Sequence, residues 1–148
     1  MIKIGIASDH GGYDLKQQII GEFTSTFEII DFGCENSKDS VDYPDYISKV
    51  CHAVSNEEIE WGIAICGTGI GASIVANRFE KIRAALCHNQ FTGQMARAHN
   101  DSNMLVLGAR VLGPGLVFSI IHTFANTAFE GGRHESRLNK INHCSTNK

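Results

Sequence analysis

Short apolar, β-branched runs alternate with longer stretches of helical periodicity along the whole chain. Five runs are expected to be strands, at residues 2–7, 27–32, 61–66, 83–87 and 104–107. Six intervening stretches are expected to be helices, at residues 13–25, 44–56, 71–79, 91–99, 114–125 and 134–141. Because most of the runs are apolar on both faces, they favour a parallel sheet with helices on both sides. We therefore expect an α/β fold, a Rossmann-like three-layer α/β/α sandwich with a five-stranded parallel sheet.

The length and composition are those of one globular domain. The chain has 148 residues, with 43% apolar and 20% charged side chains. We expect one domain over residues 1–148, with a C-terminal tail from about residue 139 whose last residues, 144–148, are frayed. The longest apolar stretch, residues 116–125, is short and contains Ser119, His122 and Thr123, so it does not predict a membrane span. The first residues lack the order of a signal peptide.

Charge is unevenly distributed between the two halves. The net charge of −3 argues against a nucleic-acid partner. Residues 1–77 contain 4 Lys and 12 acidic residues, whereas every arginine lies later in the chain. The six are Arg78, Arg83, Arg97, Arg110, Arg133 and Arg137. Arginine suits bidentate contact with a phosphate, although composition alone leaves chance as an equal explanation.

The five cysteines do not form a recognisable framework. Their number is odd and none of them forms a C-x-x-C pair, which argues against disulfides and a zinc site and favours a reducing cytoplasm. Cys51 and Cys87 are interpreted as core residues, and Cys34 and Cys144 have no evident role. Cys66 differs because it directly precedes a glycine-rich turn.

That turn is the most informative segment of the chain. It joins an expected buried strand to a helix and reads Cys66-Gly67-Thr68-Gly69-Ile70-Gly71-Ala72. Its backbone N–H groups beside a helix start would form an anion site. A dinucleotide site is disfavoured because the turn follows the third strand and the next strand ends without an acid. A thiol beside such a turn is expected to act as base or nucleophile. The alternative is that the turn only connects the strand tightly to the helix and that Cys66 is a buried residue at the end of the strand.

Three further sets of polar residues are candidates for ligand binding. Asp9 and His10 follow the first strand, where they suit contacts to a polyol or phosphate, or simply cap a helix. His99 ends a helix and is either an acid/base group or a partner of the helix dipole. Arg133 and Arg137 share one helical face, where they would hold a phosphate or form a solvated face with Glu130 and Glu135.

Together these segments resemble the type B ribose-5-phosphate isomerases and the related galactose-6-phosphate isomerase subunits. The resemblance runs in order from residue 8 to residue 137. The matching pieces are Ser8-Asp9-His10-Gly11-Gly12, Asp42-Tyr43-Pro44, Cys66 to Gly71, Ala76-Asn77, Arg83-Ala84, Ala98-His99-Asn100-Asp101, Leu107 to Val111 and Phe129 to His134. Each is modest alone, and together they are highly specific.

The resemblance implies a role for each matching residue. It implies that Cys66 is the catalytic base, that His99 is the acid/base that opens the sugar ring, and that Thr68 belongs with them. It implies substrate or phosphate contacts from Asp9, His10, Tyr43, Gly67, Gly69, Ile70, Gly71, Asn100, Arg110, Arg133 and Arg137. Other family members use a glutamate as base where Ala72 stands here, so this chain falls on the cysteine side.

The resemblance also implies a substrate, an assembly and a fold that agrees with the strand pattern. The reaction is aldose–ketose isomerisation of ribose 5-phosphate through an enediolate, without metal or cofactor, and the spacing of the sequence offers no metal cluster. The site lies at the interface of a homodimer, with a tetramer as the alternative assembly, and we expect Arg110, Arg133 or Arg137 to come from the neighbouring chain. The alternatives are an isomerase of a six-carbon sugar phosphate (galactose or allose 6-phosphate) and a non-catalytic nucleotide-binding domain.

Overall fold

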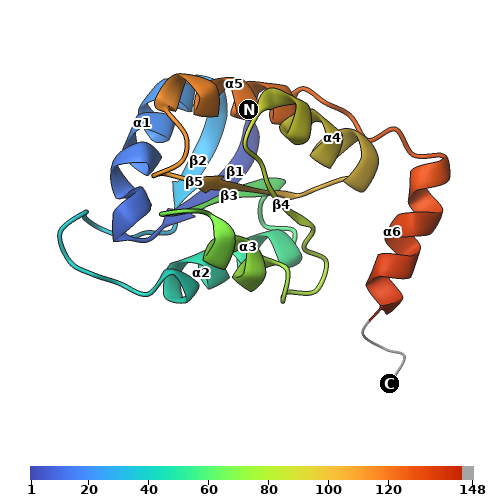
Figure 1. Ribbon diagram of the computed structural model, residues 1–148, viewed down its shortest axis with the longest axis horizontal. Coiled ribbons are helices and arrows are strands. Elements are labelled where there is room, and N and C mark those ends of the chain that lie inside the picture. The colour runs from blue at the N-terminus through green and yellow to red at the C-terminus, as the bar shows by residue number, and fades with distance from the viewer. Residues whose placement is uncertain (145–148) are drawn as a thin grey trace.

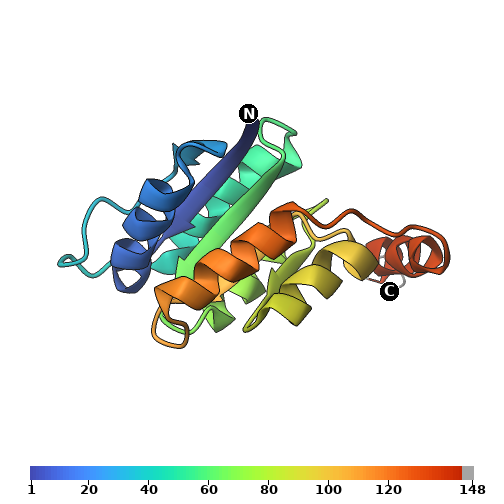
Figure 2. The ribbon, with the colours of Figure 1, turned by 90° about the horizontal axis from the view of Figure 1, so that it is seen from above.

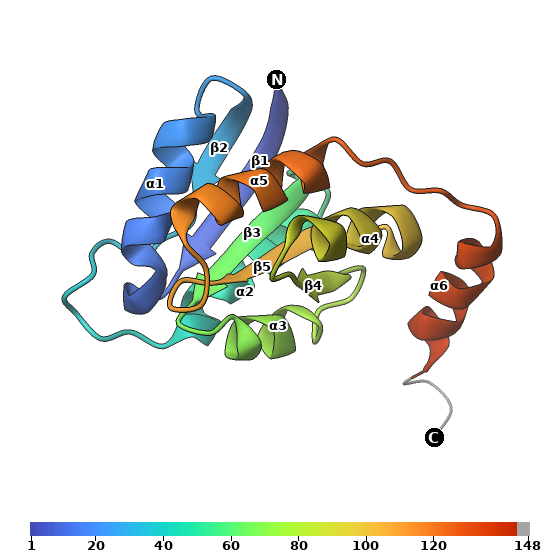
Figure 3. The same cartoon turned by 45° about the horizontal axis from the view of Figure 1, so that its top comes forward.

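The strands form one parallel sheet in the order β2-β1-β3-β5-β4 (Figure 3). The computed structural model describes residues 1–144. The strands are β1 (Ile2–Ser8), β2 (Phe27–Asp31), β3 (Trp61–Cys66), β4 (Ala84–Leu86) and β5 (Met104–Gly108). The helices are η1 (His10–Gly12), α1 (Tyr13–Phe23), α2 (Tyr43–Ser55), α3 (Ile70–Ala76), α4 (Gln90–Asn100), α5 (Pro114–Ala125) and α6 (Arg133–His143).

Helices cover both faces of the sheet, which confirms the three-layer architecture. Helices α1, α4 and α5 lie on one face and α2 and α3 on the other (Figures 1 and 2). Two apolar clusters fill the space between the layers. The first is centred on Ile63, Ile65 and Phe124, and the second on Ile47, Val50 and Val106. Residues of β1, β3 and β5 contribute to both clusters, as strands buried on two faces must.

Local sequence signals account for where several helices begin. Pro44 stands in the first turn of α2 and Pro114 in the first turn of α5, where a missing N–H costs nothing. Helix α4 begins with a reciprocal cap in which Asn89 and Thr92 each satisfy the other's backbone N–H. Such a cap contributes about 1 kcal/mol to the free energy of unfolding.

The structure corrects two expected boundaries. The edge strand β4 has three residues rather than five, partly because the Arg83 N–H donates to the Asn103 side chain instead of to a strand. Helix α6 extends to His143, so residues 139–143 are helical and do not belong to a tail; its apolar anchor Leu138 is buried. The expected fraying at 144–148 falls almost entirely on residues 145–148, which lie outside the described residues.

Strand order places a crevice between β1 and β3. The chain leaves β1 for β2 on one side, and then crosses to β3 on the other side of β1. Adjacent connections diverge at such a switch point, and ligands bind outside the carboxyl ends of its strands. The groups after β1 and β3 are therefore the first candidates for a site. None of the helices formed by residues 1–144 is long and apolar enough to cross a bilayer.

Candidate active site

A cavity of about 470 Å³ opens at this switch point. It is formed by the groups that follow β1 and β3, by the start of α3 and by the segment after β5. Its lining residues are Asp9, Tyr43, Cys66, Gly67, Thr68, Ile70, Gly71, Ile74 and Arg110. Eight of these were predicted from the sequence as site residues, with Ile74 as the addition. The carboxyl edge of the sheet thus gathers residues that are about 100 positions apart in the chain.

Cys66 is the last residue of β3 and lies at the base of this cavity. Its side chain is almost fully buried, at 4% exposed, and it lines the cavity beside Gly67. Gly69 begins α3 in the left-handed region, with φ of 79°, a conformation that favours glycine. Thr68 is exposed at the turn, and its hydroxyl oxygen accepts a hydrogen bond from the Ile70 N–H at 3.3 Å.

Gly108, at the end of β5, does not line the cavity but makes room for the turn, a role that the sequence analysis did not predict. It pairs with Cys66 across the sheet. A Cβ atom on Gly108 would lie 2.5 Å from the Thr68 carbonyl oxygen, so only glycine lets the turn pass this close. The signal in the sequence is a glycine at the end of an otherwise bulky apolar strand, Met-Leu-Val-Leu-Gly.

Arg110 lies in the same cavity as Cys66 of its own chain. Its backbone N–H donates to the Gly67 carbonyl at 2.8 Å, and the Ala109 N–H donates to the Cys66 carbonyl at 2.9 Å. A Cβ built on Gly67 would be 3.4 Å from the Arg110 Nη1 atom, so the guanidinium lies against the turn. Of the three arginines that we expected a neighbouring chain could supply, Arg110 instead lies beside Cys66 of its own chain, because the segment after β5 is fixed directly to the segment after β3.

Asp9 and His10 have defined backbone partners. Asp9 is 8% exposed, and its Oδ1 atom accepts from the Gly12 N–H at 3.0 Å, so it is a helix cap as well as a cavity residue. The Val41 N–H donates to His10 Nδ1 at 3.1 Å. This bond assigns the neutral imidazole proton to Nε2, which makes Nε2 a donor. His10 is not among the residues that line the cavity.

An ion pair between buried Lys16 and partly exposed Asp31, which the sequence analysis missed, holds the loop that contacts His10. Lys16 on α1 is fully buried, and its Nζ donates to Asp31 Oδ1 at 2.6 Å, to Asp31 Oδ2 at 2.8 Å and to the Cys34 carbonyl at 2.7 Å. These bonds fix the beginning of the segment that runs to Val41. Removing the Asp31 carboxylate would leave the buried Lys16 ammonium without its counter-charge, which is strongly destabilising.

Tyr43 covers the other side of the cavity. Its ring lies so close to Gly71 that a Cβ there would overlap it. Ile70 and Ile74 are both 56% exposed on the adjacent face of α3. A polar floor with an apolar wall is typical of a small-molecule site.

Four predicted site residues lie elsewhere: His99, Asn100, Arg133 and Arg137. His99 and Asn100 end α4, just before β5 begins, at the amino edge of the sheet. Cys66 is level with Gly108 at the other end of β5, so these edges are about 13 Å apart along the strand. Both arginines are exposed on α6, which stands at the end of an extended segment beside α4 (Figure 3). One chain alone does not bring these four residues to Cys66.

His99 has neighbours that the sequence did not indicate. Its ring stacks on the ring of His134, with centroids 4.3 Å apart and planes 16° apart. Glu130 Oε2 lies 3.8 Å from His99 Nε2 and 3.3 Å from His134 Nε2. One of the two readings left open for the arginines of α6 paired them with Glu130, but Glu130 faces the two imidazoles. These three residues form a cluster that could hold a metal ion. The sequence analysis predicted no metal cluster, because His99 is 31 positions from Glu130 and 35 from His134.

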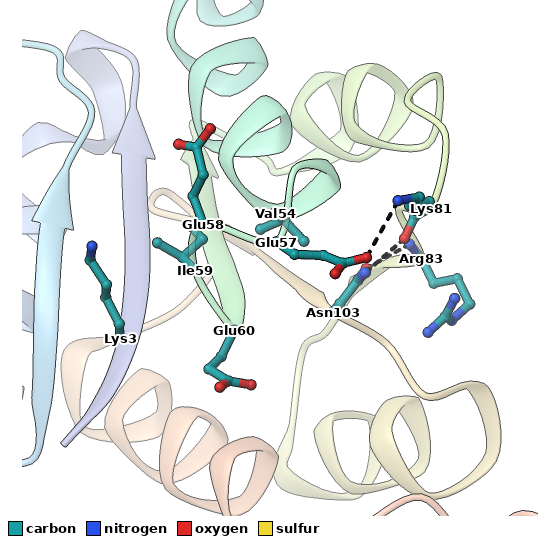
Figure 4. Close-up of a pocket in the computed structure, with 9 residues that line it drawn as sticks. All are labelled: Lys3, Val54, Glu57, Glu58, Ile59, Glu60, Lys81, Arg83 and Asn103. Carbon is teal, nitrogen blue, oxygen red and sulfur yellow. Dashed lines mark hydrogen bonds and ion pairs between the residues drawn. The ribbon is translucent and has the colours of Figure 1, made fainter.

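A second cavity, of about 610 Å³, lies at the amino edge of the sheet (Figure 4). Its rim mixes charges of both signs, with Glu57 paired to Lys81 at 3.4 Å and both side chains largely exposed. It lies away from the strand ends where the crevice forms, and holds no cysteine, histidine or glycine turn. Despite its larger volume, it has none of the groups that the predicted chemistry needs.

Cys66 lines the cavity, whereas two of the other thiols lie in the apolar core. Cys51 and Cys87 are buried among apolar side chains, which confirms that they are core residues. Burial raises the pKa of Cys51 to about 12 and that of Cys87 to about 11. Both therefore stay protonated at neutral pH and cannot supply a thiolate. All five cysteines are free.

Comparison with known proteins agrees with this arrangement. A family model described as Ribose/Galactose Isomerase matches residues 4–141. The structure of ribose-5-phosphate isomerase B from Clostridium thermocellum is 48% identical, with a TM-score of 0.95 over 98% of each chain. Ribose-5-phosphate isomerase B of Escherichia coli is 42% identical over 95% of each chain. D-erythrulose-4-phosphate isomerase of Pectobacterium atrosepticum is 37% identical over 95% of this chain and 93% of its own.

The family match covers both edges of the sheet, from β1 through most of α6, and so includes the cavity and the His99 cluster. The matched structure has the same fold over nearly its whole length. A non-catalytic nucleotide-binding domain, the alternative left open by the glycine-rich turn, does not account for these matches. The chain belongs to the ribose/galactose isomerase family and is an isomerase.

Proposed function

We propose that the chain interconverts ribose 5-phosphate and ribulose 5-phosphate. The observation that carries this proposal is the position of Cys66: a thiol at the base of a cavity, beside a glycine-rich turn and the Arg110 guanidinium. Aldose–ketose isomerisation needs one base that takes and returns a proton, and donors for the oxygen that becomes negative. Both lie within this cavity, and the named ribose-5-phosphate isomerases among the relatives support the five-carbon substrate.

The proposed reaction moves one proton between two adjacent carbons. The Cys66 thiolate removes the proton from C2 of the open-chain aldose, and the electron pair forms a C1–C2 double bond as the C1 carbonyl becomes an enediolate oxygen. N–H groups of the turn at residues 67–71 stabilise that charge. The thiol then returns the proton to C1, and the C2 hydroxyl becomes the ketone as its proton passes to the oxygen at C1. The net change is an isomerisation, with no redox partner.

A second copy of the chain is proposed to complete the site. The cavity contains Cys66 and Arg110, whereas His99, Arg133 and Arg137 lie at the other edge of the sheet and on α6. A phosphosugar held by Cys66 can reach those groups only if they come from a neighbouring protomer. A homodimer whose two sites each use both chains satisfies this requirement, and its twofold symmetry gives two equal sites.

We expect two inactive variants of this enzyme to restore each other. Dimers with Cys66→Ala in one protomer and Arg133→Ala in the other contain one doubly damaged site and one intact site. When these dimers are purified through two different affinity tags, about half of the wild-type activity should be present, because symmetric sites contribute equally.

The structure supplies a matched control for this experiment. Arg110 shares a cavity with Cys66 of its own chain, so dimers that combine Cys66→Ala with Arg110→Ala have two damaged sites and should stay inactive. Activity in the Arg110 pair, or none in the purified Arg133 pair, would contradict the proposed division of the site between chains.

Steady-state assays decide the substrate. We expect kcat/KM for ribose 5-phosphate to exceed that for allose 6-phosphate, galactose 6-phosphate and erythrulose 4-phosphate by at least about tenfold, the usual effect of one misplaced carbon group in a shaped pocket. The assays should contain EDTA, because the proposed steps use only side chains and backbone. A six-carbon or four-carbon sugar phosphate that outperforms ribose 5-phosphate would replace it as the substrate.

A further inference from the structure

The cluster of His99, Glu130 and His134 has the composition of a transition-metal site. His99 ends α4, Glu130 lies in the segment between α5 and α6, and His134 is in the first turn of α6. One ligand atom from each residue lies within 4.8 Å of the other two. Two imidazoles and one carboxylate are the donor set of many zinc sites that keep a position open for water. Magnesium and calcium prefer sites made of oxygen alone.

The distances in the cluster are close to those that a bound ion requires. Two ligands at about 2.0–2.1 Å from a tetrahedral Zn²⁺ are about 3.4 Å apart. Glu130 Oε2 lies 3.3 Å from His134 Nε2, which meets this requirement, and 3.8 Å from His99 Nε2. The ligand atoms of His99 and His134 lie within 4.8 Å of each other, so the His99 ring must rotate toward Glu130 to complete the set. Its side chain is 35% exposed and has room to make that movement.

The backbone holds the three residues together without an ion. The Glu130 N–H donates to the Ala98 carbonyl at 2.9 Å, which fixes Glu130 beside the end of α4. The His134 N–H donates to the Gly131 carbonyl at 3.1 Å, and the side chain of His134 is only 7% exposed. The turn between them uses Gly131 and Gly132 at φ of 67° and 56°. Glu130 and His134 are therefore held near their ligand positions before any ion binds, which lowers the entropy cost of binding.

We infer that His99, Glu130 and His134 bind a divalent ion of the zinc class, with the open coordination positions filled by water. The consequence for activity rests on the proposed function, in which His99 opens the sugar ring. An ion on His99 Nε2 removes the lone pair that this step needs, so the ion acts as a reversible inhibitor and not as a cofactor.

Calorimetric titration with ZnCl₂ in a non-chelating buffer tests the site without any substrate. We expect saturable binding of one ion per chain in the micromolar range. Glu130→Gln and His99→Asn should each weaken it by at least about tenfold, because even the loss of a group that only supports a ligand costs about 10–100-fold. Both side chains are partly exposed, so both variants should fold, and a thermal melt without metal checks this. His134→Gln removes the third ligand from a buried position.

Matched controls separate this cluster from other zinc-binding groups. His88 is an exposed histidine outside the cluster, and Cys66 and Cys144 are the thiols most able to capture zinc by position. His88→Asn, Cys66→Ala and Cys144→Ser should each bind one ion as the wild type does. Unchanged affinity in Glu130→Gln and His99→Asn, no saturable binding by the wild type, or loss of binding in a cysteine variant would overturn the proposal.

The effect of Zn²⁺ on the isomerisation rate tests the proposed role of His99 separately from metal binding. We expect micromolar Zn²⁺ to inhibit the isomerisation of ribose 5-phosphate, EDTA to reverse the inhibition, and Mg²⁺ to have no effect. If Zn²⁺ binds to the cluster in the titration but leaves the rate unchanged, the site stands and the role of His99 in ring opening fails.

Discussion

Replacing Cys66 by alanine should abolish isomerisation while the sugar phosphate still binds. The substitution removes one sulfur atom from the base of the cavity and leaves the N–H groups of the turn and the Arg110 guanidinium in place. Loss of a general base lowers kcat by about 10²–10⁴-fold, and Cys66 is proposed both to remove and to return the proton, so we expect the upper end of this range. Binding should change little, because the phosphate and hydroxyl contacts come from other residues.

Two measurements check this expectation. Isotope exchange shows whether the enzyme still transfers protons to the sugar: in D₂O, the wild type should introduce deuterium at C1 of ribulose 5-phosphate, and Cys66→Ala should not. Calorimetry gives the affinity for the sugar phosphate. Cys51→Ala is the matched control, since Cys51 is buried, its pKa is raised to about 12 by burial, and it should remain active. Near-normal turnover by Cys66→Ala would remove Cys66 from the role of base.

Replacing His99 by asparagine should separate ring opening from proton transfer. Ribose 5-phosphate is mainly a cyclic furanose, whereas ribulose 5-phosphate has no hydroxyl free to close that ring. An acid/base group that moves a proton on the ring oxygen is therefore needed only for the aldose. We expect the rate from ribose 5-phosphate to fall by about 10²-fold or more, and the rate from ribulose 5-phosphate to fall far less.

The dependence on enzyme concentration identifies the missing step. With His99→Asn, the rate from ribose 5-phosphate should stop rising as enzyme is added, because spontaneous ring opening in solution limits it. The rate from ribulose 5-phosphate should stay proportional to enzyme. The control is His88→Asn. His88 is exposed and lies just before the start of α4, whereas His99 lies at its end, so this variant should behave as the wild type. If both rates fall equally and both stay proportional to enzyme, His99 has another role.

The complementation and zinc experiments both test the part of the chain formed by the end of α4 and by α6. The complementation experiment tests whether Arg133 on α6 of one chain completes the cavity of another. The zinc experiment tests whether an ion binds His99 together with Glu130 and His134 of the same chain. A bound ion would fix α6 to the end of α4, which is the part of the chain that carries Arg133 and Arg137. Zinc should therefore raise the melting temperature of the wild type and leave that of Glu130→Gln nearly unchanged.

Patterns within a few residues of one another were enough to predict the sheet and the cavity at its carboxyl edge. The apolar run Trp61–Cys66 is a strand with the expected bounds, and the glycines after it form the turn that was expected to bind an anion. Asp9 and Cys66 were placed at one edge because parallel strands all end on the same side. These predictions succeed because strand periodicity, proline positions and glycine turns act locally.

Only the tertiary structure decided which polar groups meet. It placed Arg110 beside Gly67 of its own chain, because the segments after β3 and β5 are joined by backbone hydrogen bonds. It placed His99 at the opposite edge, against Glu130 and His134, because α4 runs back along the sheet before β5 begins. Residues far apart in sequence come together through strand order and helix packing. Local sequence patterns carry no information on strand order or helix packing. The direction in which each element crosses the sheet therefore determined which side chains meet at each site.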